Sequence, residues 1–136
     1  AVRDGEPIDG ISLVFSEATT PSWVWDATAG GYLRVQTDGA PDVDLAGIPL
    51  AAVNVVILRV EVTYGLGVPK TELVGSGEAW INTGGRTLKA VWVKPSMNDR
   101  IQLIDGNGVP VRLAPGATWI ELVPLSGDVG FTRPPA

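Results

Sequence analysis

Closely spaced aromatic residues near the N-terminal end of the chain are the clearest candidates for a binding surface. Trp23 and Trp25 are two positions apart, which puts both indoles on one face of a strand, and Tyr32 and Arg34 follow in the next alternating segment. Flat aromatic faces stack on sugar rings and on proline-rich peptides. We therefore take Trp23, Trp25, Tyr32 and Arg34 as candidate ligand-binding residues. The competing interpretation, in which at least one of these rings belongs to the core, stays open because a small β domain needs large apolar side chains.

Acidic residues are the second group that could do chemistry. Asp38, Asp42 and Asp44 lie in one loop and could hold a weak divalent ion or act as a general acid and base. Loops of solvated aspartates are common, so we predict no metal site and no cofactor. Asp105 and Asn107 alternate as calcium ligands do, but their loop is too short and lacks the later acidic ligand. We predict a hairpin turn there instead.

The chain has no histidine and no cysteine, which removes the usual general base, the commonest metal ligand and all thiol chemistry. Ser76 lies between two glycines, but a nucleophile elbow needs a strand-to-helix turn and a histidine partner. A serine with Lys89 or Lys94 as its base stays open. We therefore name no catalytic residue.

The length and charge of the chain limit its class and its partners. Its 136 residues suit one domain, and its formal charge of −5 argues against a nucleic-acid partner, which requires a basic face. No apolar run reaches the roughly 20 residues that span a bilayer, so we expect no membrane insertion by this fragment. The first residues lack a signal-peptide pattern, and we expect the sequence to begin partway through a longer protein.

The elements that must position these residues are all predicted to be strands. Residues 52–63 are mostly Val, Ile and Leu, and the first half of this run is apolar on both faces, which predicts a central strand buried on both sides. Further strands are expected at 11–16, 23–25, 32–36, 72–82, 86–94, 100–104, 109–113 and 118–123. About nine short strands separated by glycine and proline turns predict an antiparallel meander that forms a sandwich or a partly open barrel.

The same pattern predicts the domain organisation. We expect residues 1–10 to be an irregular N-terminal lead-in, residues 11–124 a single β domain, and residues 125–136 an irregular C-terminal tail without a packing pattern. The hairpins resemble one another only in their glycine turns, so no internal repeat is predicted.

Glycines and charged residues predict three local features. The central strand should end before Tyr64, because the glycines and Pro69 that follow weaken a strand ladder. Gly75 and Gly77 predict a bulge or a bend that lets another backbone approach closely. Arg59 should pair with glutamates on its own or a neighbouring strand.

Several short motifs between Ile11 and Pro124 carry a family resemblance. They are Trp25 and Asp26, Tyr32, Arg34, Gly39, Asp44, Ala52, Asn54 to Val56, Val74 to Ala79, Trp92, Lys94, Ser96, Asp105, Gly108, Leu113, Pro115, Gly116, Thr118 to Ile120, Val123 and Pro124. In this order and spacing they resemble the C-terminal region of the YerB-like family of bacterial lipoproteins. The chain departs from the family pattern at Asp42, where a histidine is expected, so no role that needs an imidazole is implied there.

The resemblance implies exported proteins with a lipoprotein-type signal, in which an N-terminal domain precedes this β-rich region, and it supplies no catalytic assignment. We therefore expect a non-catalytic binding or scaffolding domain of an exported, lipid-anchored, extracytoplasmic protein of the cell envelope. Its expected partner is a cell-wall polymer or an envelope protein. Two alternatives stay open. One is part of a cell-wall-acting enzyme that uses carboxylates or is completed by an absent N-terminal domain, and the other is a self-associating structural domain that pairs along an open strand edge.

Overall fold

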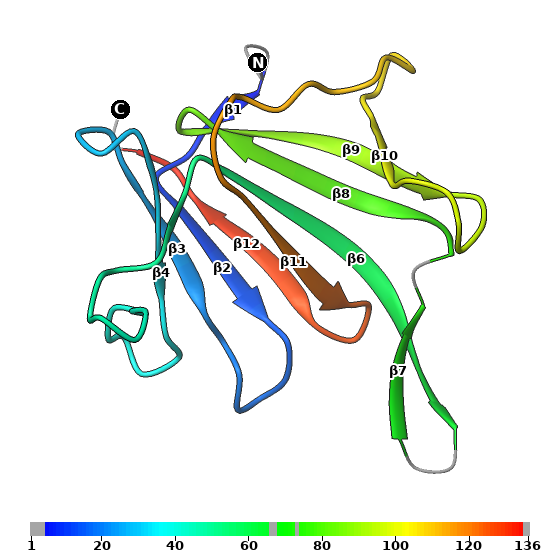
Figure 1. Cartoon of the computed structure of the whole chain (residues 1–136), viewed down its shortest axis with the longest axis horizontal. Helices are drawn as coiled ribbons and strands as arrows, with labels where there is room; N and C mark the ends of the chain where they lie inside the picture. The colour runs from blue at the N-terminus through cyan, green and yellow to red at the C-terminus, as the bar shows by residue number, and fades with distance from the viewer. Residues whose placement is uncertain (1–4, 66–67, 73, 135–136) are drawn as a thin grey trace.

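Two β-sheets make up the described structure. The computed structural model describes residues 5–65, 68–72 and 74–134, in which twelve strands form a seven-stranded and a five-stranded sheet (Figure 1). These residues include no helix that could cross a membrane. The sheets do not close into a barrel. The predicted all-β class is therefore confirmed, in the form of a sandwich.

The large sheet runs in the order β1-β9-β8-β6-β11, with β10 beside β9 and β7 beside β6. Its strands are β1 (Glu6–Pro7), β6 (Asn54–Gly65), β7 (Val68–Glu72), β8 (Gly75–Thr83), β9 (Arg86–Lys94), β10 (Gln102–Ile104) and β11 (Thr118–Pro124). The small sheet runs in the order β12-β2-β3-β4-β5. Its strands are β2 (Gly10–Val14), β3 (Ser22–Asp26), β4 (Gly31–Val35), β5 (Ala51–Ala52) and β12 (Asp128–Thr132).

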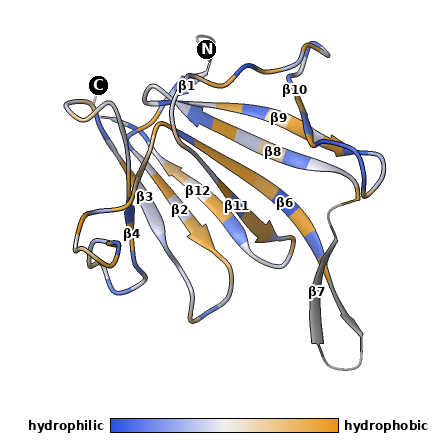
Figure 2. Ribbon diagram, in the orientation of Figure 1, coloured by the Kyte–Doolittle hydropathy of each residue, from blue (hydrophilic) through white to orange (hydrophobic). Residues whose placement is uncertain are grey.

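Strand β6 is the centre of the large sheet, as predicted. It pairs with β8 on one side and with β11 on the other. Four consecutive residues, Val55 to Leu58, are at most 2% exposed, because one sheet face meets the small sheet and the other is covered as well. Figure 2 shows the hydrophobic character of this strand and its change to polar residues further along. Beyond that change Glu61 is exposed, so the wetter second half is also confirmed.

Each face of the large sheet has its own hydrophobic core. Val55 and Ile57 face the small sheet and form one core cluster with its residues Ile11, Leu13 and Trp23. On the opposite face, the cluster comprises Val56, Leu58, Val60, Ala79, Ile81, Ala90 and Trp92. Partly buried side chains from β10 and the segments around it, among them Ile101, Leu103 and Val111, pack against this second cluster. The segment between β9 and β11 therefore serves as a cover, although the sequence pattern predicts only a hairpin there.

Both ends of the chain differ from the prediction. Residues 1–10 and 125–136 were expected to be irregular, yet Glu6–Pro7 forms β1 and Asp128–Thr132 forms β12. β12 pairs antiparallel with β2 and brings Val129 and Phe131 against the core between the sheets. The expectation is wrong because the short alternation of Val129 and Phe131 lies among glycine and proline residues that are typical of a tail.

The topology also departs from a simple meander. β11 pairs with β6 in parallel, in register from Thr118 opposite Asn54 to Pro124 opposite Val60. A parallel neighbour requires a long crossover, and here the crossover is the covering segment between β9 and β11. Sequence periodicity gives strand positions but no pairing direction, which explains the difference.

The predicted hairpin of 100–104 with 109–113 is wrong in its second strand. Gln102–Ile104 pairs with β9 instead, and a single bridge between Ile104 and Pro110 follows the turn. Pro110 has no N–H to donate, so it cannot extend a ladder. The turn itself is confirmed, because the Asp105 carboxylate accepts backbone hydrogen bonds from Asn107 (2.9 Å) and Val109 (3.0 Å).

Strand β6 continues further than predicted. It extends to Gly65 and pairs there with β7, with Tyr64 opposite Pro69, while residues 66–67 lie outside the described residues. Its pairing with β8 ends at Leu58 opposite Ala79. The prediction is wrong because this part of β6 belongs to a two-stranded ribbon, in which a proline is tolerated more easily than in a central strand.

Gly77 lies on β8 just outside the β6–β8 ladder, whose last pair is Leu58 with Ala79. β8 and β9 keep a continuous register from Gly75 to Thr83, so no bulge lies between these two strands. The predicted close approach is confirmed, because a Cβ on Gly77 would lie 2.7 Å from the backbone oxygen of Arg59 and 2.6 Å from Nε1 of Trp92. The Trp92 indole donates to that same oxygen at 2.8 Å. The indole thus satisfies a carbonyl near the point where the two strands part.

We expect Gly77→Ala to lower the unfolding free energy by about 1–3 kcal/mol, because the added methyl group meets backbone and a buried ring that cannot move away freely. Gly106→Ala is the matched control. A Cβ at Gly106 meets nothing within 4 Å. The control should therefore change stability by no more than about 0.5 kcal/mol. Urea unfolding followed by tryptophan fluorescence measures both, and equal effects would contradict the close approach.

Candidate functional site

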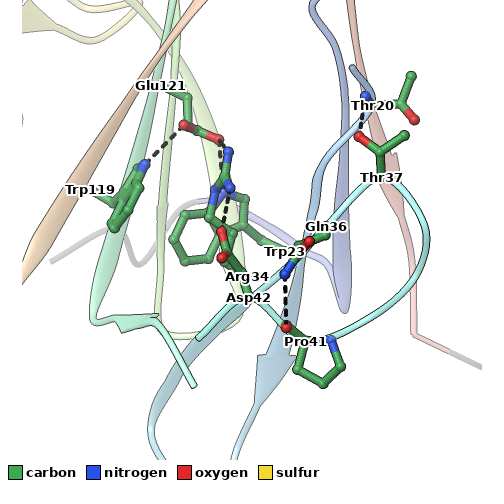
Figure 3. Close-up of polar contacts among 9 residues, drawn as sticks. All are labelled: Thr20, Trp23, Arg34, Gln36, Thr37, Pro41, Asp42, Trp119 and Glu121. Atoms are coloured by element: carbon green, nitrogen blue, oxygen red, sulfur yellow. Dashed lines mark hydrogen bonds and ion pairs between the residues drawn. The ribbon is translucent and has the colours of Figure 1, made fainter. Parts of the chain in front are cut away.

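Arg34 lies at the centre of a group of polar and aromatic side chains between the two sheets. It comes from β4, and its guanidinium donates to Asp42 at 2.6 Å and to Glu121 at 3.4 Å. The two acidic partners come from different places, since Asp42 lies in the loop after β4 and Glu121 lies on β11 of the other sheet (Figure 3). The side chains of Arg34 and Asp42 are 19% and 21% exposed. This ion pair therefore reaches the surface.

Glu121 is the buried member of the group, with 6% of its surface exposed. Its carboxylate accepts from the indole N–H of Trp119 (2.9 Å) and of Trp23 (3.3 Å), in addition to Arg34. The Trp23 and Trp119 rings lie edge to face with centroids 5.4 Å apart. The guanidinium carbon of Arg34 is 5.9 Å from the Trp23 centroid and 5.5 Å from the Trp119 centroid. The positive charge thus lies within the range of a cation–π contact with both rings.

The structure places the four candidate ligand-binding residues on one sheet face, which is the inner one. Trp23 and Tyr32 are fully buried, and Trp25 is half-buried against Tyr32, with centroids 4.9 Å apart. The predicted shared face is therefore real, but it packs into the core, which is the alternative that the sequence left open. The role of these four residues in binding a ligand stays a prediction. Of the four, Arg34 is the one whose charged group reaches the surface.

An open pocket of about 490 Å³ lies beside the ion pair. It is lined by one proline and six residues of polar type, whose methyl and methylene groups also face the pocket: Thr19, Pro21, Arg34, Gln36, Thr37, Asp38 and Asp42. Two hydrogen bonds shape its wall: Thr37 Oγ1 accepts from the backbone N–H of Thr20 (2.9 Å), and Gln36 Nε2 donates to the carbonyl of Pro41 (3.3 Å) (Figure 3). The pocket therefore presents hydrogen-bond donors and acceptors to solvent.

The three loop aspartates have separate tasks. Asp42 holds Arg34, while Asp38 accepts from the backbone N–H of Ala40 (2.9 Å). Asp44 accepts from the backbone N–H groups of Ala46 and Ile48 within its own loop. Within the described part of the chain, no three His, Cys, Asp or Glu residues come close enough to hold a metal ion.

Glu121 and Trp119 are members of the site that the sequence analysis did not include. Trp119, Glu121 and Val123 alternate along β11 and therefore share the face that meets the small sheet. The sequence signal for this part of the site was a glutamate between two apolar residues on the same strand face. The contact with Arg34 spans 87 positions in the sequence, so periodicity alone could not reveal it.

Comparison with known proteins assigns the chain to a family. The family model described as "Protein of unknown function (DUF3048) C-terminal domain" matches residues 11–120. The chain belongs to this family. The YerB protein from Bacillus subtilis has a similar structure, with a TM-score of 0.76 and 22% sequence identity over 91% of this chain. The resemblance to the YerB-like family is thereby confirmed, and the structural likeness establishes the shared fold.

The chain spans 44% of the YerB chain that it matches, so the family fold described here is one part of that longer protein. No curated protein matches the sequence.

Burial changes the ionisation of Tyr32 at the other end of the same sheet face. Desolvation raises the pKa of its hydroxyl from 10.0 to about 12, and the nearby backbone of Gly85 and Arg86 offsets part of this rise. Among the described residues the hydroxyl has no hydrogen-bond partner of ordinary geometry. The neutral phenol is therefore the form that the folded domain accommodates.

This raised pKa predicts a loss of stability at alkaline pH. Below pH 10 both the folded and the unfolded chain keep the proton, so Tyr32 adds no pH dependence. Between pH 10 and about 12, only the unfolded chain loses it. The unfolding free energy should then fall by about 1.4 kcal/mol per pH unit from this residue. Tyr32→Phe should lack this part of the slope when urea unfolding is compared between pH 9 and pH 11.5, and an unchanged slope would refute it.

We expect Glu121→Gln to destabilise the fold by about 2–4 kcal/mol. The amide removes the charge that faces Arg34 and turns an NH₂ group toward one of three donors, which leaves buried polar groups unpaired. Glu78→Gln is the matched control, because Glu78 is 57% exposed and lies 4.0 Å from its partner Lys89. Its effect should stay below about 0.5 kcal/mol. The denaturant midpoints of both variants provide the test. Equal midpoints would contradict a structural role for the Glu121 carboxylate.

Proposed function

We propose that the chain is a non-catalytic binding domain of an exported cell-envelope protein, and that its ligand is a neutral, hydroxyl-rich segment of a wall polysaccharide. The observation that carries this proposal is the pocket beside the Arg34–Asp42 ion pair. Both charged side chains are about one-fifth exposed and are held in place by 2.6 Å contact with each other. A fixed guanidinium beside a fixed carboxylate offers donors and acceptors together, which is what adjacent hydroxyl groups of a sugar require.

The pocket lining favours a neutral ligand over an ionic one. Asp38 and Asp42 both carry negative charge at the pocket, and Arg34 is already paired, so an anion gains little there. The whole chain carries a formal charge of −5, which adds to the repulsion of anionic polymers. A hydroxyl group can accept from the guanidinium and donate to a carboxylate in the same pose.

The aromatic rings act on this pocket indirectly. Trp23 and Trp119 lie beside the Arg34 guanidinium and, with Glu121, position it in the lining of the pocket. Since Pro21 is the one apolar side chain in the lining, a sugar gains little stacking energy. We therefore expect one pocket to bind the polysaccharide weakly, with a Kd of about 1 mM. Tighter binding then requires several pockets that bind the same polymer at once.

The exported context forms part of the proposal and rests on the family resemblance. Protoplasts that carry the full-length parent protein provide the test. Added protease should digest this domain without lysis of the cells. Protection of the domain until the cells are lysed would contradict the exported context but would leave the pocket unaffected.

The soluble tetramer of N-acetylglucosamine is the probe for the pocket. We expect millimolar tetramer to shift the amide NMR signals of residues 34–38 in the wild-type chain. The double variant Thr19→Val with Asp38→Asn removes one hydroxyl and one charge from exposed positions of the lining, and should weaken binding about tenfold. Arg34 is left unchanged because its substitution would also disturb the contact with Glu121.

The matched control is Thr28→Val with Asp128→Asn, the same chemical change at exposed positions outside the pocket. It should bind the tetramer like the wild type. Equal weakening in both double variants, or no signal shift at any concentration, would overturn the proposed ligand. The appearance of new reducing ends during incubation would instead support the carboxylate-enzyme alternative.

A further inference from the structure

We propose that the loop of residues 43–49, between β4 and β5, docks into an apolar pocket on the part of the longer family protein that lies outside this domain. All seven residues of the 43–49 loop are exposed. Three of them carry large hydrophobic side chains, namely Val43, Leu45 and Ile48, which are 42%, 110% and 60% exposed. Apolar side chains that gather at the surface mark interaction sites.

The 43–49 loop has one polar side chain, and its own turn uses it. The Asp44 carboxylate accepts from the backbone N–H groups of Ala46 (2.9 Å) and Ile48 (3.0 Å). An aspartate that bonds to the backbone in this way fixes the shape of a turn. The other side chains that the loop presents to solvent are apolar, because its remaining residues are Val, Leu, Ala, Gly, Ile and Pro.

Backbone hydrogen bonds hold the 43–49 loop in one conformation. The N–H of Asp44 donates to the carbonyl of Ile48 (2.9 Å), and the N–H of Gly47 donates to the carbonyl of Asp44 (3.0 Å). At the base of the loop, the N–H of Leu50 donates to the carbonyl of Asp42 (2.7 Å). Docking therefore has little backbone left to order, which lowers the entropic cost of association.

The size of this apolar surface indicates which kind of partner fits it. Full burial of a Val, Leu or Ile side chain removes roughly 100 Å² from water, so the three side chains together offer about 300 Å². A stable interface between separate proteins buries about 800 Å² on each partner. The loop is therefore too small to hold a free partner or a second copy by itself. A partner on the same chain needs less area, because the linker supplies an effective concentration in the millimolar range.

The family provides a partner of this tethered kind. The chain covers 44% of the YerB chain, so more than half of that protein lies outside the shared fold. An anionic lipid surface fits the loop less well, because the loop adds the charge of Asp44 to a chain whose formal charge is −5. The occupant that the size and charge of the loop favour is therefore an apolar pocket elsewhere on the same protein.

The 43–49 loop and the Arg34 pocket are separate surfaces. The loop starts directly after Asp42, but none of its seven residues lines the pocket. Docking of the loop therefore does not depend on the sugar ligand proposed for the pocket. A substitution at Leu45 should leave the signal shifts that the N-acetylglucosamine tetramer causes unchanged, so the two proposals can fail independently.

Methyl NMR of the isolated chain and of the full-length parent protein tests the docking. A soluble nitroxide broadens the signals of methyl groups that solvent reaches, and in the isolated chain it should broaden those of Leu45 and Met97, which are 110% and 83% exposed. In the full-length protein the broadening of Leu45 should fall at least threefold. Met97 is the control, because it belongs to the connection between β9 and β10, on the opposite side of the molecule from the connection between β4 and β5 (Figure 1). Unchanged broadening of Leu45, or an equal loss at Met97, would overturn the proposal.

Leu45→Ser separates docking from stability. Because this side chain is fully exposed, the urea midpoint of the isolated chain should not change. In the full-length protein the variant should return the broadening of the Ile48 methyl signal to its value in the isolated chain. Met97→Ser is the matched control and should leave the Ile48 signal protected. Continued protection of Ile48 in the Leu45→Ser variant would contradict docking through the loop.

Two further measurements distinguish other occupants. Sedimentation of the isolated chain should show a monomer, and a dimer that Leu45→Ser dissociates would make a second copy the occupant. Vesicles of neutral phosphatidylcholine should leave the Leu45 methyl signal of the isolated chain unprotected, and protection by the vesicles would make a lipid surface the occupant. Either result would refute a pocket on the same protein.

Discussion

The carboxylate of Glu121 is the interaction on which the arrangement of the two sheets depends. It is almost fully buried, so its charge must be compensated within the protein. The donors are Arg34 and Trp23 of the small sheet and Trp119 of its own strand in the large sheet. An isolated buried carboxylate would cost several kcal/mol, and these donors are available only when β3, β4 and β11 lie face to face. The group therefore specifies how the sheets meet as well as where Arg34 lies.

The large sheet has a second constraint, since both of its faces must be covered. The small sheet covers one face, and the segment between β9 and β11 covers the other with Ile101, Leu103 and Val111. The same segment carries the chain across the sheet, so that β11 can lie parallel to β6. Arg59 then donates to the carbonyls of Pro124, Leu125 and Gly127, which fixes the turn into β12. Among the side chains that the structure describes, no glutamate pairs with Arg59, and the sequence expectation of a cross-strand ion pair is not met there.

These structural constraints also shape the surface. Arg34 contacts Glu121 and the rings of Trp23 and Trp119 on its buried side. Its ion pair with Asp42 therefore presents a positioned guanidinium and carboxylate to solvent. The 43–49 loop follows directly after Asp42 and closes its own turn with its one carboxylate, which leaves apolar side chains exposed. Both candidate binding surfaces thus use the segment that joins β4 to β5. In a family whose function is not established, such surfaces are where partners of the longer protein can be sought.

Local chemistry was sufficient to predict the all-β class, the buried central strand, the glycine turns and the close approach at Gly77, because each depends on a residue's own conformational preference or on periodicity along one strand. The shared face of Trp23 and Trp25 also followed from spacing. Spacing could not tell that this face points inward, because Glu121 and Trp119 lie about a hundred positions away and only tertiary packing brings them together. The strand at Asp128–Thr132 and the parallel pairing of β11 were decided in the same way. Strand pairing depends on which distant segment supplies hydrogen bonds and apolar contact, and no single stretch of sequence contains that information.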